Sequence, residues 1–139
     1  MSDPARILIV DDNELIGIAF AEALRDAGYQ VHAEQSALEA VRMAAQCPFD
    51  VVFTDLLMSE MSGVEVCQAI KRACPQTQVV LMSGHPEAAR AQRAAFLSAG
   101  GHAEILPKPI RIDTLLDVTQ RLVPPARPID DASAGGGGV

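Results

Sequence analysis

Four short apolar runs in this chain each lead into residues that can handle a phosphoryl group or a metal ion. The runs are Ile7-Leu8-Ile9-Val10, Val51-Val52-Phe53-Thr54, Val79-Val80-Leu81-Met82 and Ile105-Leu106, and after them come Asp11 and Asp12, Asp55, Ser83 and Lys108. Ligands of open α/β sheets bind outside the carboxyl ends of the strands. If the runs are parallel strands, these five side chains meet at that edge. The sequence therefore predicts an α/β fold with one site there.

Helical patterns separate the apolar runs. The predicted helices span residues 13–27, 37–46, 63–73, 87–99 and 112–122, and the predicted strands span 7–10, 29–33, 49–54, 77–82 and 103–106. The strand at 49–54 is apolar almost throughout rather than alternating, which is typical of a strand buried on both faces of a parallel sheet. Regular alternation of strands and helices with short loops predicts right-handed crossovers and helices on both faces.

The length and the C-terminal composition predict one folded domain with a tail. A chain of 139 residues has the common size of a single domain. After Val123 the sequence becomes rich in proline and then glycine, so we expect a domain at 1–123 and a disordered tail at 124–139. No apolar stretch approaches the roughly 20 residues of a membrane span, and the first residues lack a signal-peptide core, so we expect a cytoplasmic protein.

Charge and cysteine content exclude several other classes of function. A net charge of -7 repels a phosphate backbone, and aromatic residues at 4% provide no stacking platform, so we expect no direct nucleic-acid binding. The three cysteines, Cys47, Cys67 and Cys74, show no CxxC spacing, and we expect reduced thiols packed as small apolar side chains.

The residues at the predicted strand ends match the needs of phosphoryl transfer. Three crowded carboxylates need a counter-charge, and Mg²⁺ prefers carboxylate oxygens together with water and phosphate oxygens. Lys108 is suited to stabilising charge on a transferring phosphoryl group, and Ser83 to donating a hydrogen bond to it. Asp55, at the end of the central strand, is the natural nucleophile.

Taken one at a time, these residues are better explained without a site. An Asp pair such as Asp11-Asp12 caps helices, Asp55 and Ser83 suit turns, and Lys108 between two prolines suits a surface loop. Their common position at the strand ends is what favours a site.

The ordered set of motifs resembles the response regulator receiver domain of two-component signalling. The matching stretches are Ile7 to Asn13, Asp55-Leu56-Leu57-Met58 with Met61 and Gly63, Leu81-Met82-Ser83-Gly84, and Leu106-Pro107-Lys108-Pro109. The resemblance covers residues 5 to about 122. It implies a flavodoxin-like, doubly wound sheet of five parallel strands in the order 2-1-3-4-5, with helices on both faces.

The resemblance also implies roles for individual residues. Asp55 would accept a phosphoryl group from a sensor histidine kinase or a histidine phosphotransfer protein. Asp12, Asp55 and the main-chain carbonyl of Leu57 would bind Mg²⁺ directly, and Asp11 would bind it through water. Ser83 would be the switch hydroxyl, and the Lys108-Pro109 bond would be cis.

Three positions depart from the family pattern. Ser59 stands where the family usually has proline, which predicts a looser loop after Asp55. Ile105 replaces the usual aromatic residue three positions before the lysine, so the usual coupling of hydroxyl and ring is absent. The stretch from Ser83 to Lys108 is longer than usual, with the extra length expected near Gly100-Gly101-His102.

The leading hypothesis is a phosphorylation-activated switch that signals by binding an unknown downstream protein, with a homodimer left open. The protein would not be an enzyme beyond its own phosphorylation and dephosphorylation. One alternative is a docking module that does not respond to phosphorylation, suggested by Ser59 and Ile105. The other is an Mg²⁺ phosphatase of the haloacid-dehalogenase kind, which chain order disfavours because Leu57 stands where that family has its second Asp.

Overall fold

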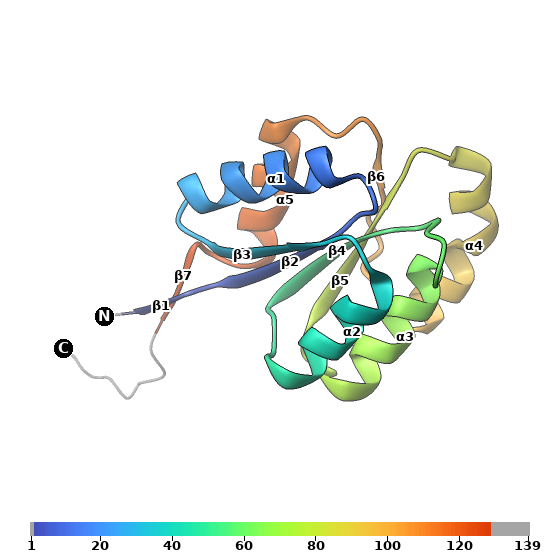
Figure 1. Ribbon diagram of the computed structural model, residues 1–139, viewed down its shortest axis with the longest axis horizontal. Coiled ribbons are helices and arrows are strands. Elements are labelled where there is room, and N and C mark those ends of the chain that lie inside the picture. Colours follow the sequence, from blue (N-terminus) through green and yellow to red (C-terminus); the bar gives the residue numbers. More distant parts are fainter. Residues whose placement is uncertain (1, 129–139) are drawn as a thin grey trace.

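The computed structural model of the protein, which describes residues 2–128, is a three-layer α/β sandwich (Figure 1). Its central sheet has five parallel strands in the order β3-β2-β4-β5-β6. The strands are β2 (Arg6–Val10), β3 (Gln30–Glu34), β4 (Val51–Asp55), β5 (Gln78–Ser83) and β6 (Leu106–Pro107). Numbered along the chain as five strands, this order is 2-1-3-4-5, as the resemblance implied.

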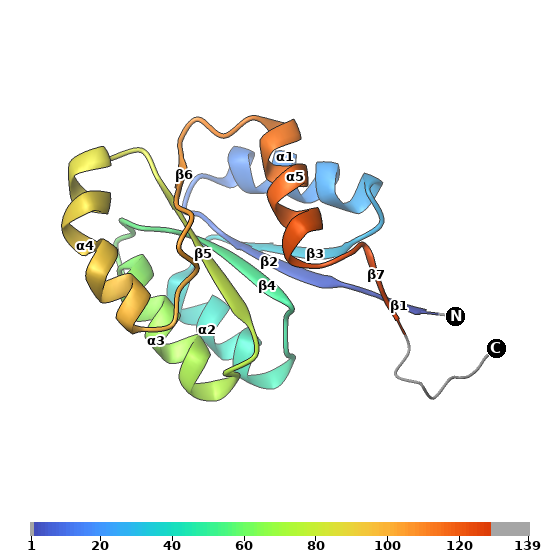
Figure 2. The same ribbon diagram turned by 180° about the vertical axis from the view of Figure 1, so that it is seen from behind.

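Five helices cover the two faces of this sheet, and Figure 2 shows the same layers from behind. The helices α1 (Glu14–Asp26) and α5 (Ile112–Leu122) lie on one face. The other face carries α2 (Ala37–Gln46), α3 (Gly63–Ala73) and α4 (Pro86–Ser98). The predictions for α2, α3 and α5 are confirmed at both ends, and α1 and α4 differ from theirs by a single residue at each end.

Side-chain caps account for the sharp starts of the first three helices. The Asn13 side chain accepts a hydrogen bond from the Ile16 N–H at 3.2 Å, and the Ser36 hydroxyl accepts one from the Glu39 N–H at 3.2 Å. Before α3, Ser62 and Glu65 form a reciprocal capping box. These bonds satisfy N–H groups that have no partner within the helix.

Alternate residues of the buried strands build two separate cores. Ile7 and Ile9 of β2 face the core under α1 and α5, together with Phe20, Leu24, Phe53, Leu115 and Val118. Leu8 and Val10 face the core under the other three helices, together with Val52, Val66, Ile70, Leu81 and Phe96. The central strand β4 is buried at every position, which confirms the prediction of a strand covered on both faces.

The register of the strands aligns their carboxyl ends. Val10 pairs with Thr54, and Met82 pairs with both Asp55 and Leu106. Just beyond the strand pairs, the N–H groups of Asp11, Leu56 and Lys108 donate to carbonyls of neighbouring strands at 3.1, 3.0 and 2.7 Å. These backbone bonds place the residues that follow three different strands at one edge of the sheet.

The last strand of the sheet is shorter than predicted. We expected a strand at 103–106, whereas β6 begins at Leu106. Before it, the Gly101 N–H bonds to the Phe96 carbonyl and the His102 N–H to the Val79 carbonyl. The chain from His102 to Leu106 is longer than the facing stretch of β5 from Val79 to Met82, so regular pairing with β5 begins only at Leu106. Gly101 packs against the Phe96 ring so closely that a Cβ would lie 2.2 Å from it.

A second, two-stranded sheet lies at the other end of the molecule. Strand β1 (Ser2–Pro4) pairs antiparallel with β7 (Ala126–Pro128), and the Ala5 N–H extends the pair to the Pro125 carbonyl. Strand β7 falls in the segment predicted to be a disordered tail, so that prediction does not describe residues 126–128. The remainder of the tail, 129–139, lies outside the described residues.

Two further sequence predictions concern the described residues. None of the helices within 2–128 is long and apolar enough to cross a membrane. Cys47, Cys67 and Cys74 are free thiols, with Cys67 buried in the core, as we expected from their spacing.

Candidate functional site

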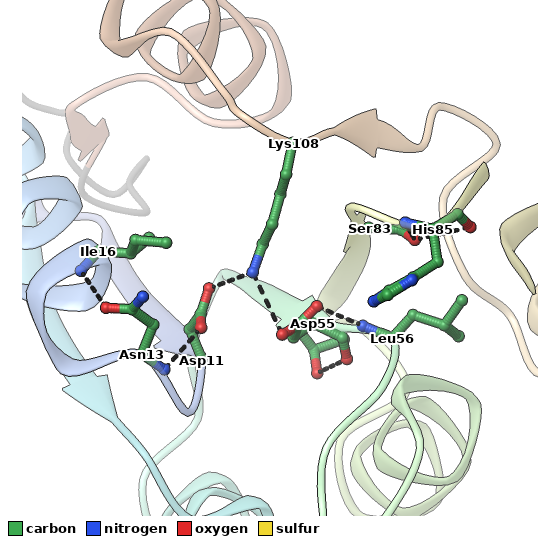
Figure 3. A network of polar contacts seen from close by, with 9 residues as sticks. Asp11, Asn13, Ile16, Asp55, Leu56, Ser83, His85 and Lys108 are labelled. Atoms are coloured by element: carbon green, nitrogen blue, oxygen red, sulfur yellow. Dashed lines mark hydrogen bonds and ion pairs between the residues drawn. The ribbon is translucent and has the colours of Figure 1, made fainter.

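The ammonium group of Lys108 lies between two carboxylates at the carboxyl edge of the sheet (Figure 3). Its Nζ is 2.7 Å from Oδ2 of Asp11 and 3.2 Å from Oδ2 of Asp55. Asp11 follows β2, Asp55 ends β4 and Lys108 follows β6, so three segments far apart in the sequence meet here. The Lys108-Pro109 bond is cis, as the resemblance implied.

Asp55 is the buried carboxylate at the end of the central strand, with 8% of its surface exposed. Its Oδ1 accepts a hydrogen bond from the Leu56 N–H at 3.0 Å. Burial raises the pKa of Asp55, and the nearby charges of Asp11 and Asp12 add to the rise, while Lys108 opposes it. The pKa of the Asp55 carboxylate therefore depends on the positive charge of Lys108.

Lys108 remains a cation in spite of its partial burial. Burial by itself lowers the pKa of an ammonium group, but the hydrogen bonds and charges of Asp11 and Asp55 outweigh that effect and raise the pKa of Lys108. The site thus holds a fixed positive charge beside its buried carboxylates at neutral pH.

Asp11 connects the site to the first helix. It is 2% exposed, and its Oδ1 accepts a hydrogen bond from the Asn13 N–H at 2.9 Å. Asn13 is in turn the N-cap of α1. Asp12, the neighbour of Asp11, is exposed and extends the acidic edge towards solvent.

The donor set at this edge fits a hard divalent cation. Asp11, Asp12 and Asp55 each offer one carboxylate oxygen, and these three oxygens lie within 4.8 Å of one another. Three carboxylates beside one ammonium group leave a formal charge of -2. Mg²⁺ binds oxygen ligands at about 2.1 Å and usually keeps several waters, so a short movement of these side chains would suit it.

Ser83 lies at the end of the strand next to β4 and is 4% exposed. Its Oγ donates to the His85 carbonyl at 3.2 Å and accepts from the His85 N–H at 2.9 Å. Within residues 2–128, Ser83 Oγ has no hydrogen bond to Asp55. The structure therefore puts Asp11, Asp55 and Lys108 in direct contact, with Asp12 close by and the Ser83 hydroxyl engaged with the loop before α4.

Several residues that shape the site were not assigned a role from the sequence. The N–H groups of Asn13 and Leu56 orient the two buried carboxylates. Gly63 packs so tightly that a Cβ would lie 2.7 Å from the Asp55 carbonyl oxygen, so a larger residue there would move the end of β4. Glu60 bonds to the start of α2. The motif match named Gly63, but no local spacing pointed to Glu60.

The structure shows the surroundings of two of the residues that depart from the family pattern. Ile105 is partly buried and packs against the core under α2, α3 and α4. Ser59 is exposed in the loop after β4. Both positions lie on segments that flank the acidic edge.

The parallel sheet is doubly wound, and its strand ends carry a pair of acids, a central Asp and a lysine. This combination defines a flavodoxin-like protein of the phosphate-handling kind. Over residues 7–120 the sequence matches the family of response regulator receiver domains. The chain belongs to this family.

Individual relatives and solved structures agree with this assignment. A response regulator receiver protein of Anaeromyxobacter sp. (strain Fw109-5) is 34% identical over 115 residues, which cover 81% of this chain and 46% of the relative. The response regulator MprA of Mycobacterium avium (strain 104) is 29% identical, over 93% of this chain and 55% of its own length. The chain thus spans about half the length of these curated relatives.

The fold is also similar to those of known receiver structures. The chemotaxis response regulator CheY4 of Vibrio cholerae is 31% identical with a TM-score of 0.73, covering 86% of this chain and 99% of that one. A CheY-like receiver domain protein from Methanospirillum hungatei JF-1 has a TM-score of 0.77 at 25% identity, covering 86% and 94%.

Proposed function

We propose that this chain is the phosphoacceptor switch of a two-component phosphorelay, with Asp55 as the acceptor. The observation that carries the proposal is the contact of Lys108 with both Asp11 and Asp55, because it unites a buried nucleophile, a metal-binding acid and a cation. The phosphodonor would be a phosphohistidine of a sensor histidine kinase or of a histidine phosphotransfer protein.

Each residue of the site has a defined part in the transfer. An Oδ atom of Asp55 attacks phosphorus, the new O–P bond forms as the N–P bond of the donor breaks, and the leaving histidine nitrogen keeps the electron pair. The resulting acyl phosphate needs neutralisation, and the Lys108 ammonium group lies within reach of it. Ser83 exchanges its bonds with His85 for a bond to a phosphoryl oxygen.

Asp11, Asp12, Asp55 and the Leu57 carbonyl would hold Mg²⁺, with Asp11 acting through water. The bound ion supplies charge neutralisation and orientation of the phosphoryl oxygens. The chain's own groups prepare this: Asn13 orients Asp11, the Leu56 N–H orients Asp55, and burial keeps bulk water from the nucleophile.

The phosphodonor would approach along an apolar groove next to Lys108. This groove has a volume of about 350 Å³ and is lined by Leu15, Ile16, Ala19, Phe20, Lys108, Pro109, Ile110 and Ile112. Leu15 is 78% exposed and Ile112 is 39% exposed, so the groove offers apolar surface to a partner. A donor protein whose histidine reaches Asp55 must cover the surface around Asp55. The apolar groove is part of that surface, because Lys108 is one of its lining residues.

Output would follow from a shift between two conformations when phosphate adds charge at Asp55 and draws Ser83 and Lys108 inward. The downstream partner would be a protein rather than nucleic acid or a membrane, and a homodimer stays open. The receiver domain at 1–123 and the cytoplasmic location expected from the sequence remain parts of this proposal, and the tail is proposed only for the residues after β7.

The decisive test is the intact mass of the protein after incubation with Mg²⁺ and acetyl phosphate. We expect the wild type to gain one phosphoryl group, ~80 Da, and Asp55→Asn to gain none. Wild type treated with EDTA is the matched control and should also stay unmodified. The absence of a gain in folded, Mg²⁺-loaded wild type would contradict the proposal and favour a constitutive docking module. Sustained turnover of a phosphate ester would favour the phosphatase alternative.

A further inference from the structure

The loop from Asp55 to α3 is attached at both ends but has few polar contacts between them. At its ends, the Leu56 N–H bonds to β5 at 3.0 Å and the Gly63 N–H bonds to the Leu56 carbonyl at 2.7 Å. Among residues 57–61, Glu60 is the one whose hydrogen bonds, within the described part of the chain, reach another segment. Met58 and Met61 pack against the core, so Glu60 adds the one polar anchor between the two ends of the loop, within the described residues.

Glu60 reaches the N-terminus of α2. Its Oε1 accepts a hydrogen bond from the Ser36 hydroxyl at 3.0 Å and a longer one from the Leu38 N–H at 3.4 Å. The same hydroxyl accepts from the Glu39 N–H, so Ser36 caps its own helix and binds Glu60 at once. A carboxylate at this position also interacts favourably with the positive end of the helix dipole.

The anchor on α2 is rigid, so the bond from Glu60 adds a directional polar restraint to the apolar packing of Met58 and Met61. Ala37, Ala40 and Ala44 of α2 are buried in the core, which holds the helix in place. Ser59 restricts its backbone φ angle less than a proline, which would set it near -65°. A bond from residue 60 to a fixed helix end therefore limits the conformations open to residues 57–60.

We propose that Glu60 is a positioning residue, which holds the loop so that the Leu57 carbonyl points at the Mg²⁺ site. The inference rests on the proposed function, in which Leu57 is a metal ligand with Asp12 and Asp55. Glu60 acts through the backbone three residues away and does not itself bind the ion. Its contribution would appear first in the affinity for Mg²⁺ and then in the rate of phosphorylation.

The test is the Mg²⁺ dissociation constant of the full chain, measured by NMR titration or calorimetry without any phosphodonor. We expect Glu60→Ala to weaken Mg²⁺ binding by about tenfold, the size of effect seen when outer-shell support of a metal ligand is removed. Ser36→Ala should produce a similar loss, and the double variant should lose little more than either single one. Glu60→Gln keeps an acceptor oxygen and should bind Mg²⁺ closer to the wild-type level.

The matched control is Glu39→Ala, which removes one negative charge from the first turn of the same helix. Glu39 pairs with Arg42 at 3.4 Å and has no side-chain bond to the loop. We expect its Mg²⁺ affinity to equal that of the wild type. If Glu39→Ala, Glu60→Gln and Glu60→Ala all weaken Mg²⁺ binding equally, the effect arises from long-range charge alone. That result would overturn the inference.

The outcomes also separate this inference from the proposed function. Wild type that binds Mg²⁺ and is phosphorylated, together with a folded Glu60→Ala of unchanged Mg²⁺ affinity, overturns the role of Glu60 alone. Wild type that binds no Mg²⁺ overturns both. Thermal unfolding without Mg²⁺ identifies a Glu60→Ala protein that is merely destabilised, and in that case Glu60→Gln decides: tenfold weaker binding by this variant would contradict the hydrogen-bond role.

Discussion

The ammonium nitrogen of Lys108 lies 3.2 Å from the carboxylate of Asp55, the proposed phosphoacceptor, and 2.7 Å from Asp11. A cation in this position neutralises part of the charge that a metal ion would otherwise neutralise. It also stands where charge accumulates on an incoming phosphoryl group. These two effects act in opposite directions on metal binding and on phosphorylation, so they can be separated by experiment.

Replacement of Lys108 by Gln should therefore change metal binding and phosphoryl transfer in opposite directions. We expect Lys108→Gln to bind Mg²⁺ more tightly than the wild type, because three carboxylates lose their competing cation. We expect its phosphorylation by acetyl phosphate to slow by roughly 100-fold, within the range for loss of one electrostatic stabiliser. Mg²⁺ titration and time-resolved intact mass measure the two quantities, and weaker Mg²⁺ binding in the variant would contradict the charge argument.

Asp12 offers a way to detect the metal through stability. Because Asp12 is exposed, Asp12→Asn should leave the free energy of unfolding without metal nearly unchanged. At Mg²⁺ about ten times above its Kd, the wild type should gain about 1.4 kcal/mol, and Asp12→Asn much less. Thermal melts with and without Mg²⁺ measure this difference. The matched control, Asp26→Asn at the far end of α1, should keep the full Mg²⁺-dependent shift; its loss there would indicate non-specific binding.

Tyr29, the one tyrosine of the chain, predicts a dependence of stability on alkaline pH. Its hydroxyl donates to the Val123 carbonyl at 2.8 Å, and burial raises the pKa of the phenol. The folded protein thus favours the neutral phenol. This contribution to stability is complete below the ordinary tyrosine pKa of ~10 and is lost as pH rises through the higher folded pKa.

Absorbance of tyrosinate against pH should show this shift directly, with the protein in denaturant as the reference. Tyr29→Phe should lower the free energy of unfolding at pH 7 by about 1–2 kcal/mol, because the Val123 carbonyl loses its partner. The variant should also lack any tyrosinate signal. A folded-state titration at or below that of the denatured protein would show that the phenol is not buried as described.

Cys67 should be the least reactive thiol of the protein. It is fully buried on α3, and burial raises its pKa to about 11, with Lys71 opposing the rise slightly. At pH 8 only about one in a thousand such thiols is ionised. We expect iodoacetamide to label Cys67 at least ~10-fold more slowly than Cys47 or Cys74, and all three equally in guanidinium. Mass spectrometry of peptides measures the rates, and rapid native labelling of Cys67 would contradict the packing.

The helices and the buried strands could be predicted from local patterns, because capping residues, glycine and proline stops, and apolar runs each act within a few positions. For example, the sequence marks both ends of the helix that begins after Ser36 and ends at Gln46. Strand β6 was predicted too long because its pairing with β5 begins only at Leu106, and a local pattern does not report the register between two strands. Strand β7 was missed because its partner lies at the other end of the chain.

The sequence by itself determined which residues end the strands, and through the alternation of elements it determined that Asp11, Asp12, Asp55, Ser83 and Lys108 gather at one edge. Only the tertiary structure decided how they meet. Lys108 bonds to Asp11 across 97 positions of sequence, Ser83 turns to His85, and Glu60 bonds to Ser36. Local patterns report contacts within a turn or two, whereas side-chain partners across the sheet depend on strand register and loop packing.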